Sequence, residues 1–129
     1  MISIILSFLK SKYPSILWTV LIFVLCTIPS DEVVKVFTLS DKINHIIAFA
    51  GFTFFWLFRT SLVNFLIILG IFYGILIELW QAILPEHFHR GFSYLDMASD
   101  AIGCILGYFI YLSFQFIVKK MQKNASQNN

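Results

Sequence analysis

The chain has 129 residues, of which 59% are apolar, 18% aromatic and 12% charged, with a formal net charge of +2. Ordinary soluble domains contain roughly 25% charged and about 45–50% apolar residues, so this composition predicts an integral membrane protein. The small net charge does not favour nucleic-acid binding, and we expect no nucleic-acid partner. The length suits about four membrane spans of roughly 20 residues each. We therefore expect any chemistry to come from helix ends and short loops, not from a soluble catalytic domain.

Residues 1–12 are apolar but interrupted by serine and lysine, and they predict an interfacial helical lead-in. Successive apolar runs then predict an all-α fold with four transmembrane helices, at residues 13–28, 43–58, 62–84 and 95–118. No cleavage site with small residues follows the first run, which favours an uncleaved signal-anchor. The third run stops at Pro85, because proline cannot continue a helix without loss. The polar residues 119–129 are expected to form a frayed or disordered tail.

The cysteines and tryptophans of the chain are most simply structural residues. Cys26 and Cys104 lie within apolar runs, where free buried thiols are more common than a disulfide. The three tryptophans, Trp18, Trp56 and Trp80, are typical of membrane-interface and packing positions.

Basic residues divide unequally between the two sides of the predicted bundle. One side carries Lys10, Lys12, Arg59, Lys119, Lys120 and Lys123, and the other carries Lys35, Lys42 and Arg90. The positive-inside rule therefore predicts cytoplasmic termini, with the loops at 31–42 and 85–94 facing outward. We expect a multi-pass protein of a bacterial cytoplasmic membrane.

Polar residues in the last three predicted spans recur at i, i+3 or i+4 spacing, which places them on one helical face. The three stripes are Asp41, His45, Ala48 and Phe52; Gly70, Gly74, Glu78 and Gln81; and Asp96, Asp100, Gly103 and Gly107. Small residues at this spacing let helices approach closely, so the glycines are expected to pack the third and fourth spans together. The polar ends would splay into a shared outward-facing site beneath a loop with His87, His89, Arg90 and Ser93. Carboxylates inside apolar spans are costly, which makes this constellation a candidate functional site.

The same polar residues could instead have a purely structural role, in which they pair with one another or cap helices. Glu78 can pair with Arg90, and Asp96 can cap the fourth helix, where the helix dipole favours an acid. Asp100 and Glu78 fit this interpretation less well, because each lies about one turn inside its span.

The outward loop also contains residue types that could support two other kinds of chemistry. Glu86, His87 and His89, together with His45, are residue types that bind zinc, but their spacing is unspecific. A Ser93 nucleophile with a histidine base is chemically allowed, although nothing in the spacing supports it. We assign no metal and no cofactor from the sequence.

Two segments resemble the motifs of a known family. DKINHIIAFAGFTFF is similar to the D-K-x-x-H-x-x-A-F motif of VanZ-like membrane proteins. ELWQAILPEHFHRGFSYLDMASDAIGCILG is similar to that family's E-x-x-Q, a proline, an arginine and S-x-x-D-x-x-x-N-x-x-G. The resemblance covers about residues 15–115, and the matching positions are Asp41, Lys42, His45, Ala48, Phe49, Glu78, Gln81, Pro85, Arg90, Ser93, Asp96 and Gly103.

The resemblance implies a VanZ-like four-helix membrane domain at residues 13–118. The family's namesake is an accessory protein of glycopeptide-antibiotic resistance, associated with lower susceptibility to teicoplanin, and no settled reaction comes with the fold. One position departs from the family pattern. Asp100 stands where the family usually has asparagine, which adds a carboxylate one helical turn from Asp96.

The first predicted function is that the protein acts at the outer leaflet, on or with an amphiphilic or lipid-linked ligand of the cell envelope. This action would contribute to teicoplanin resistance. Lys42 and Arg90 would bind an anionic head group. The carboxylates would orient these cations or bind hydroxyls and amines. The ligand-binding set is Asp41, Lys42, His45, Glu78, Gln81, Arg90, Ser93, Asp96 and Asp100.

The alternative function is a membrane-embedded enzyme that modifies a lipid-linked substrate. Glu78 or Asp100 would act as general acid or base with His45 as partner, and Arg90 would stabilise an anion. Mutually satisfied pairs would favour binding or scaffolding, whereas an open cleft with an unpaired carboxylate and histidine would favour catalysis. An ion pathway is disfavoured, because the cytoplasmic halves of the spans lack polar groups. Beyond the lipid bilayer the sequence indicates no particular partner and no oligomeric state.

Overall fold

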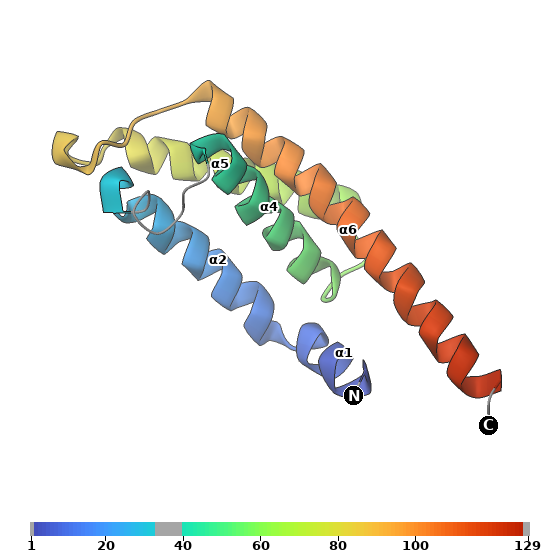
Figure 1. Ribbon diagram of the computed structural model, residues 1–129. Coiled ribbons are helices and arrows are strands. Elements are labelled where there is room, and N and C mark those ends of the chain that lie inside the picture. The colour runs from blue at the N-terminus through green and yellow to red at the C-terminus, as the bar shows by residue number, and fades with distance from the viewer. Residues whose placement is uncertain (1, 33–39, 128–129) are drawn as a thin grey trace.

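The computed structural model of the protein describes residues 2–32 and 40–127, and every regular element within these ranges is helical. The elements are α1 (Ile2–Lys10), α2 (Lys12–Thr27), α4 (Asp41–Leu57), α5 (Val63–Ala82), the 3-10 helix η1 (Glu86–Phe88) and α6 (Tyr94–Gln127) (Figure 1). The predicted all-α class is confirmed for these residues. Most of the first predicted loop, including Lys35, lies outside the described residues.

Helices α2, α4, α5 and α6 each begin within two residues of a predicted span. The prediction of a disordered tail was wrong for residues 119–127, which continue α6 as an exposed helix. This segment contains neither proline nor glycine, and its lysine, methionine, glutamine and alanine residues favour helix.

Two helices, α5 and α6, are long and apolar enough to cross a membrane. Helices α1 and α2 add a third span if they are counted together, with a bend of 57° between them. The bend falls where the ring of Pro14 would clash with the Lys10 carbonyl in a continuous helix, and α1 ends at Lys10. Helix α4 has 17 residues, about 25 Å of helix against a hydrocarbon core of about 30 Å. Two or three candidate spans are thus present in the described residues, where the sequence predicts four.

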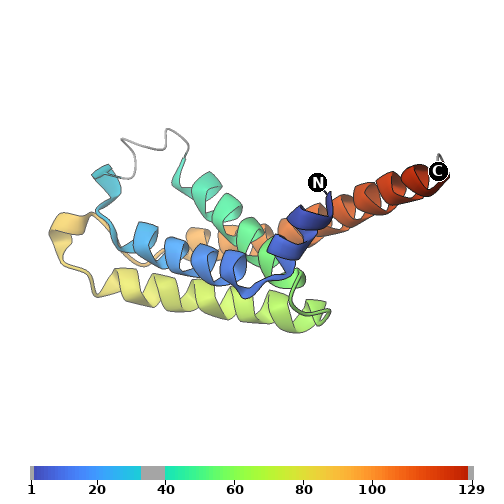
Figure 2. The same ribbon diagram turned by 90° about the horizontal axis from the view of Figure 1, so that it is seen from below.

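The helices form a bundle in which α4 packs most extensively on α6, while α5 contacts both and α2 covers α4 and α5. Helix α1 and the C-terminal end of α6 lie at one end of the bundle (Figures 1 and 2). The turn between α4 and α5 lies there too, since Arg59 Nη1 donates to the Lys10 carbonyl at 3.2 Å. The loop that carries η1 is at the opposite end, which we call the η1 end.

Hydrogen bonds donated by three tryptophan indole N–H groups join α2 to α4 and α5. Trp18 of α2 donates to the Ala48 carbonyl at 2.8 Å. In the other direction Trp56 of α4 donates to Thr19 Oγ1 at 3.0 Å, and Trp80 of α5 donates to Thr27 Oγ1 at 3.1 Å. The packing interpretation of the three tryptophans is therefore confirmed. Cys26 and Cys104 are free thiols, as expected.

Close approach of α6 to α4 depends on two glycines of α6. A Cβ atom on Gly103 would lie 2.6 Å from the Ile46 carbonyl oxygen, and a Cβ atom on Gly107 would clash with the Ala50 carbonyl. The prediction that these glycines pack against the third span was therefore wrong. They face α4, which lets the backbones of the two helices come into contact.

The glycines of α5 do face α6, as predicted. A Cβ atom on Gly70 would lie 2.5 Å from Cys104 Sγ, and one on Gly74 would lie 2.6 Å from Asp100 Oδ2. Helix α6 thus presents two adjacent stripes, one of glycine toward α4 and one containing Asp100 and Cys104 toward α5. A position three residues further along a helix lies about 60° around its axis, which is enough to direct the two stripes to different neighbours.

Candidate functional site

A buried histidine–aspartate pair joins α4 to α6 toward the η1 end. His45 Nδ1 lies 2.8 Å from Asp100 Oδ1, and the two side chains are 5% and 1% exposed. Gly74 of α5 leaves the space that Asp100 occupies. Asp100 Oδ2 has no hydrogen-bond partner among the described residues. The pair is therefore enclosed by three helices and keeps one uncommitted carboxylate oxygen.

Glu78 of α5 belongs to the same buried cluster. Its side chain is fully buried, and Oε2 accepts a hydrogen bond from the Ser93 backbone N–H at 2.7 Å. Oε1 has no hydrogen-bond partner within the described part of the chain. One carboxylate oxygen each from Glu78 and Asp100 and one ring nitrogen of His45 lie within 4.8 Å of one another. Titratable groups from three helices thus converge at one point.

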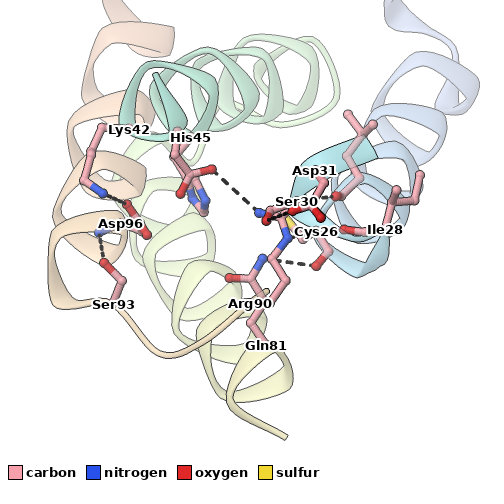
Figure 3. A network of polar contacts seen from close by, with 12 residues as sticks. Cys26, Ile28, Ser30, Asp31, Lys42, His45, Gln81, Arg90, Ser93 and Asp96 are labelled. Atoms are coloured by element: carbon pink, nitrogen blue, oxygen red, sulfur yellow. Dashed lines mark hydrogen bonds and ion pairs between the residues drawn. The ribbon is translucent and has the colours of Figure 1, made fainter. Parts of the chain in front are cut away.

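Ser93 caps the start of α6. Its Oγ accepts a hydrogen bond from the Asp96 backbone N–H at 3.2 Å, which satisfies one of the amides that a helix leaves free at its N-terminus. The Asp96 carboxylate forms an ion pair with Lys42 of α4, with 3.2 Å between Nζ and Oδ1 (Figure 3). Asp96 lies in the first turn of α6, where the helix dipole favours an acid. The prediction that Asp96 caps this helix was wrong, because Ser93 is the cap and the Asp96 carboxylate binds Lys42.

The C-terminal end of α2 is held by side chains from the other elements. Arg90 Nε donates to the Ile28 carbonyl at 3.2 Å, and Nη2 donates to the Leu25 carbonyl at 3.1 Å (Figure 3). Gln81 of α5 donates through Nε2 to the Cys26 carbonyl at 3.1 Å. Three carbonyls that the helix end would leave unpaired are thereby satisfied.

A cavity of about 270 Å³ lies between α2 and α4 beside these groups. Its apolar walls include Trp18, Leu21, Ile22, Ala48 and Phe49, and its polar residues are Asp41, Asn44, His45 and Arg90. Arg90 Nη1 lies 3.6 Å from Asp41 Oδ1. Leu21 and Ile47 also line the cavity and are 43% and 49% exposed. The cavity therefore combines an apolar wall, a charged group and an accessible rim.

The predicted site residues lie at one end of the bundle but form three groups. These are the buried cluster of His45, Glu78 and Asp100; Lys42, Ser93 and Asp96 at the start of α6; and Asp41, Gln81 and Arg90 around the end of α2. The expectation that the polar ends splay into an open site was wrong for the first group, because α4, α5 and α6 stay packed at this level.

The pairing of Glu78 with Arg90 was wrong as well. Glu78 binds the Ser93 amide, and Arg90 reaches the carbonyls of α2 instead. Helix ends carry several unpaired carbonyls, and the guanidinium can donate to two of them while still facing Asp41.

The loop histidines do not join the buried cluster. His87 is exposed, and His89 Nδ1 lies 3.1 Å from Asp31 Oδ1 in an exposed pair. Within the described ranges, the close groups of potential metal ligands contain His45 but not Glu86, His87 or His89. Ser93 Oγ is occupied as a helix cap, and no histidine contact in the described part of the chain supports a role as nucleophile.

Cavity residues from the first span were not predicted. Trp18 and Leu21 belong to an apolar run, and nothing in such a run distinguishes a cavity wall from a lipid-facing surface. Asn44 offered the one available signal, since it is a polar residue beside His45 in a span otherwise rich in aromatic residues.

Comparisons of the chain with protein-family models, with curated proteins and with solved structures found no match. The chemistry that the site supports follows from its geometry. That geometry contains an anchored guanidinium beside an apolar cavity and a buried cluster of histidine and two carboxylates.

Proposed function

We propose that the protein is a VanZ-like, four-span membrane protein that binds an amphiphilic or lipid-linked anionic ligand at the outer leaflet. In this arrangement α1 and α2 together form one bent span, and α4, α5 and α6 form the others. The termini are cytoplasmic, the membrane is that of a bacterium, and the η1 end faces outward. The biological consequence is lower susceptibility to glycopeptides such as teicoplanin.

The cavity between α2 and α4 is the observation that carries this proposal. Ligand sites are mostly apolar, with a few polar groups that orient the ligand, and this cavity has that character. Its walls suit an alkyl or acyl chain. Arg90 lines the cavity, and its Nη1 faces a half-exposed carboxylate, so an anionic head group can take the place of Asp41 as its partner.

Binding is tested with dodecyl phosphate on the detergent-purified protein by native mass spectrometry. We expect one bound molecule per chain, and no comparable binding of dodecyltrimethylammonium, which has the same chain and the opposite charge. Leu21→Trp narrows the cavity and should remove the adduct. Leu112→Trp is the matched control, because Leu112 has the same 43% exposure as Leu21 and lies on α6. Equal binding of the two amphiphiles, or equal binding by the two variants, would contradict the proposal.

The cellular arm uses a deletion strain complemented with wild type, Arg90→Ala or Leu21→Trp, with membrane expression confirmed for each. We expect the deletion to raise teicoplanin susceptibility, and both variants to fail to restore resistance. If Arg90→Ala and Leu21→Trp are well expressed and restore resistance, the cavity is not needed for the function and the proposal is wrong.

The buried cluster favours a second candidate, an enzyme that modifies a lipid-linked substrate. His45 and Asp100 form a 2.8 Å pair, and Glu78 Oε1 is buried without a hydrogen-bond partner within residues 2–32 and 40–127. Histidine and carboxylate groups held in this way can transfer protons. His45 lines the cavity, but Glu78 and Asp100 are fully buried and are not among the described residues that line it, which ranks this function second.

Mass spectrometry of extracted envelope lipids separates the two candidates. An enzyme predicts a lipid whose mass changes on deletion and stays changed when the strain carries Glu78→Gln. An unchanged lipid profile, together with altered teicoplanin susceptibility, would reject the enzyme and leave the binding function.

A further inference from the structure

The buried cluster brings two carboxyl groups and one imidazole together without a lysine or arginine partner among the described residues. Glu78 and Asp100 are both fully buried, and buried charges are normally paired or bound to a metal. The neighbouring cations have other partners, since Lys42 binds Asp96 and Arg90 binds the end of α2. With ionised carboxylates and neutral His45, the cluster holds two negative charges, which one divalent cation would balance.

We infer that His45, Glu78 and Asp100 form a binding site for one divalent transition-metal ion of the Zn²⁺ or Mn²⁺ type. Their ligand atoms lie within 4.8 Å of one another and come from α4, α5 and α6. Imidazole favours zinc and related metals, and carboxylate favours harder ions such as manganese. Three protein ligands leave a coordination position for water or for an oxygen of a ligand.

The unpaired oxygens of the cluster support this inference independently of the residue types. Glu78 Oε1 and Asp100 Oδ2 are buried and lack hydrogen-bond partners in the described part of the chain, which leaves them free to coordinate. Glu78 Oε2 is held by the Ser93 amide, and metal-binding carboxylates are usually fixed by such a hydrogen bond.

A second close group, formed by Asp41, His45 and Asp96, competes for the same histidine. It is the weaker site, because Asp41 is 49% exposed and faces Arg90, while Asp96 is paired with Lys42. A metal bound there would have to displace two ion pairs. In the buried group the side-chain pair that the structure describes is the one between His45 and Asp100, which are both ligands themselves.

The inference goes beyond the proposed function and does not depend on it. Metal binding needs no occupant in the cavity between α2 and α4. Loss of amphiphile binding in Leu21→Trp would therefore leave metal binding intact, and the two claims fail separately.

The test uses full-length protein purified through a tag without histidine, stripped with chelator and titrated with ZnCl₂ or MnCl₂. Metal content after desalting is measured by plasma mass spectrometry, and thermal unfolding is followed in parallel. We expect about one ion per chain and a raised unfolding temperature for wild type. Glu78→Gln and Asp100→Asn should each weaken metal binding at least about tenfold.

Two controls separate the buried group from its rivals. His87→Ala removes an exposed loop histidine, and Asp96→Asn removes a ligand of the competing group; both should bind metal as wild type does. Loss of binding in either control, with binding retained in Glu78→Gln, would overturn the assignment. If the carboxamide variants do not fold, the Co²⁺ spectra of wild type and Asp96→Asn decide the matter, because only the competing group loses a ligand in Asp96→Asn. Visible absorption bands of a nitrogen- and oxygen-ligated site are expected, and their absence would overturn the inference.

Discussion

Arg90 joins three parts of the molecule through a single side chain. Its guanidinium donates to two carbonyls of the end of α2 and faces Asp41 at the start of α4. The side chain is only 7% exposed, so loss of these contacts would leave buried polar groups unpaired. The planar fork of arginine suits this task, because its nitrogens point in fixed and different directions.

Arg90→Lys is expected to lower the free energy of unfolding by about 1.5–3 kcal/mol, because one ammonium cannot donate to both carbonyls. Arg59→Lys is the matched control, since Arg59 is exposed and makes one hydrogen bond to the Lys10 carbonyl. It should cost no more than about 0.5 kcal/mol. Denaturant unfolding in detergent, followed by circular dichroism, measures both. If Arg90→Lys and Arg59→Lys lose the same free energy of unfolding, the charge of Arg90 matters and the geometry of its guanidinium does not.

Helix α6 occupies the central place among the elements, because its different faces contact both α4 and α5. On the face of α6 that meets α4, Gly103 and Gly107 have no side chain, and this lets the backbones of the two helices come into contact. The adjacent face carries Asp100 and Cys104 into contact with α5. The position of Asp100 beside His45 therefore depends on how closely α6 packs against α4.

Gly103→Ala should destabilise the bundle by about 1–3 kcal/mol, the usual cost of overpacking. The added Cβ atom would lie 2.6 Å from the Ile46 carbonyl oxygen, and backbone cannot move aside cheaply. Gly91→Ala is the control, because nothing lies within 4 Å of its Cβ position and its φ angle is negative. Thermal unfolding in detergent tests the pair of variants. A neutral Gly103→Ala would mean that α4 and α6 are not held at this distance.

Over the whole molecule, charged residues gather at the two ends of the bundle, with acidic and basic residues at the η1 end and several basic residues at the other. Asp41, Lys42 and Arg90 lie at the η1 end, and Lys10 contacts Arg59 at the other. The larger number of basic residues at the end that carries Arg59 supports the proposed orientation, because basic residues are retained on the cytoplasmic side. The exposed extension of α6 adds three further lysines at the end opposite η1.

The proposed orientation predicts that His87→Cys is labelled by a membrane-impermeant maleimide in intact cells and that Ser61→Cys is not. Both positions are exposed, and they lie in loops at opposite ends of the bundle. Wild type is the background control, because its own thiols lie within apolar helices. Ser61→Cys should react only after the membrane is permeabilised. The reverse pattern of labelling would invert the proposed topology.

The sequence alone determined the helices, most of their ends and the residues that gather at the η1 end. Local rules suffice for these features: apolar runs set the spans, and Pro85 limits the third. The cap of the last helix was predicted to be Asp96, whereas the structure shows that it is Ser93. The spacing of polar residues also predicted which face of each helix carries His45, Glu78 and Asp100. Helix continuation past residue 118 was missed, because the polarity of the tail outweighed its helix propensity in the prediction.

Only the tertiary structure decided which partner each polar group has and whether the group is exposed. Periodicity assigns a residue to a face of its own helix, but it does not say which neighbour that face meets. Gly103 and Asp100 differ by about 60° around α6, and this rotation sends one to α4 and the other between α4 and α5. Arg90 likewise turned to the carbonyls of α2, a helix that contains no charged partner to predict the contact. The cavity and the buried cluster arise from these packing choices, which depend on several helices at once.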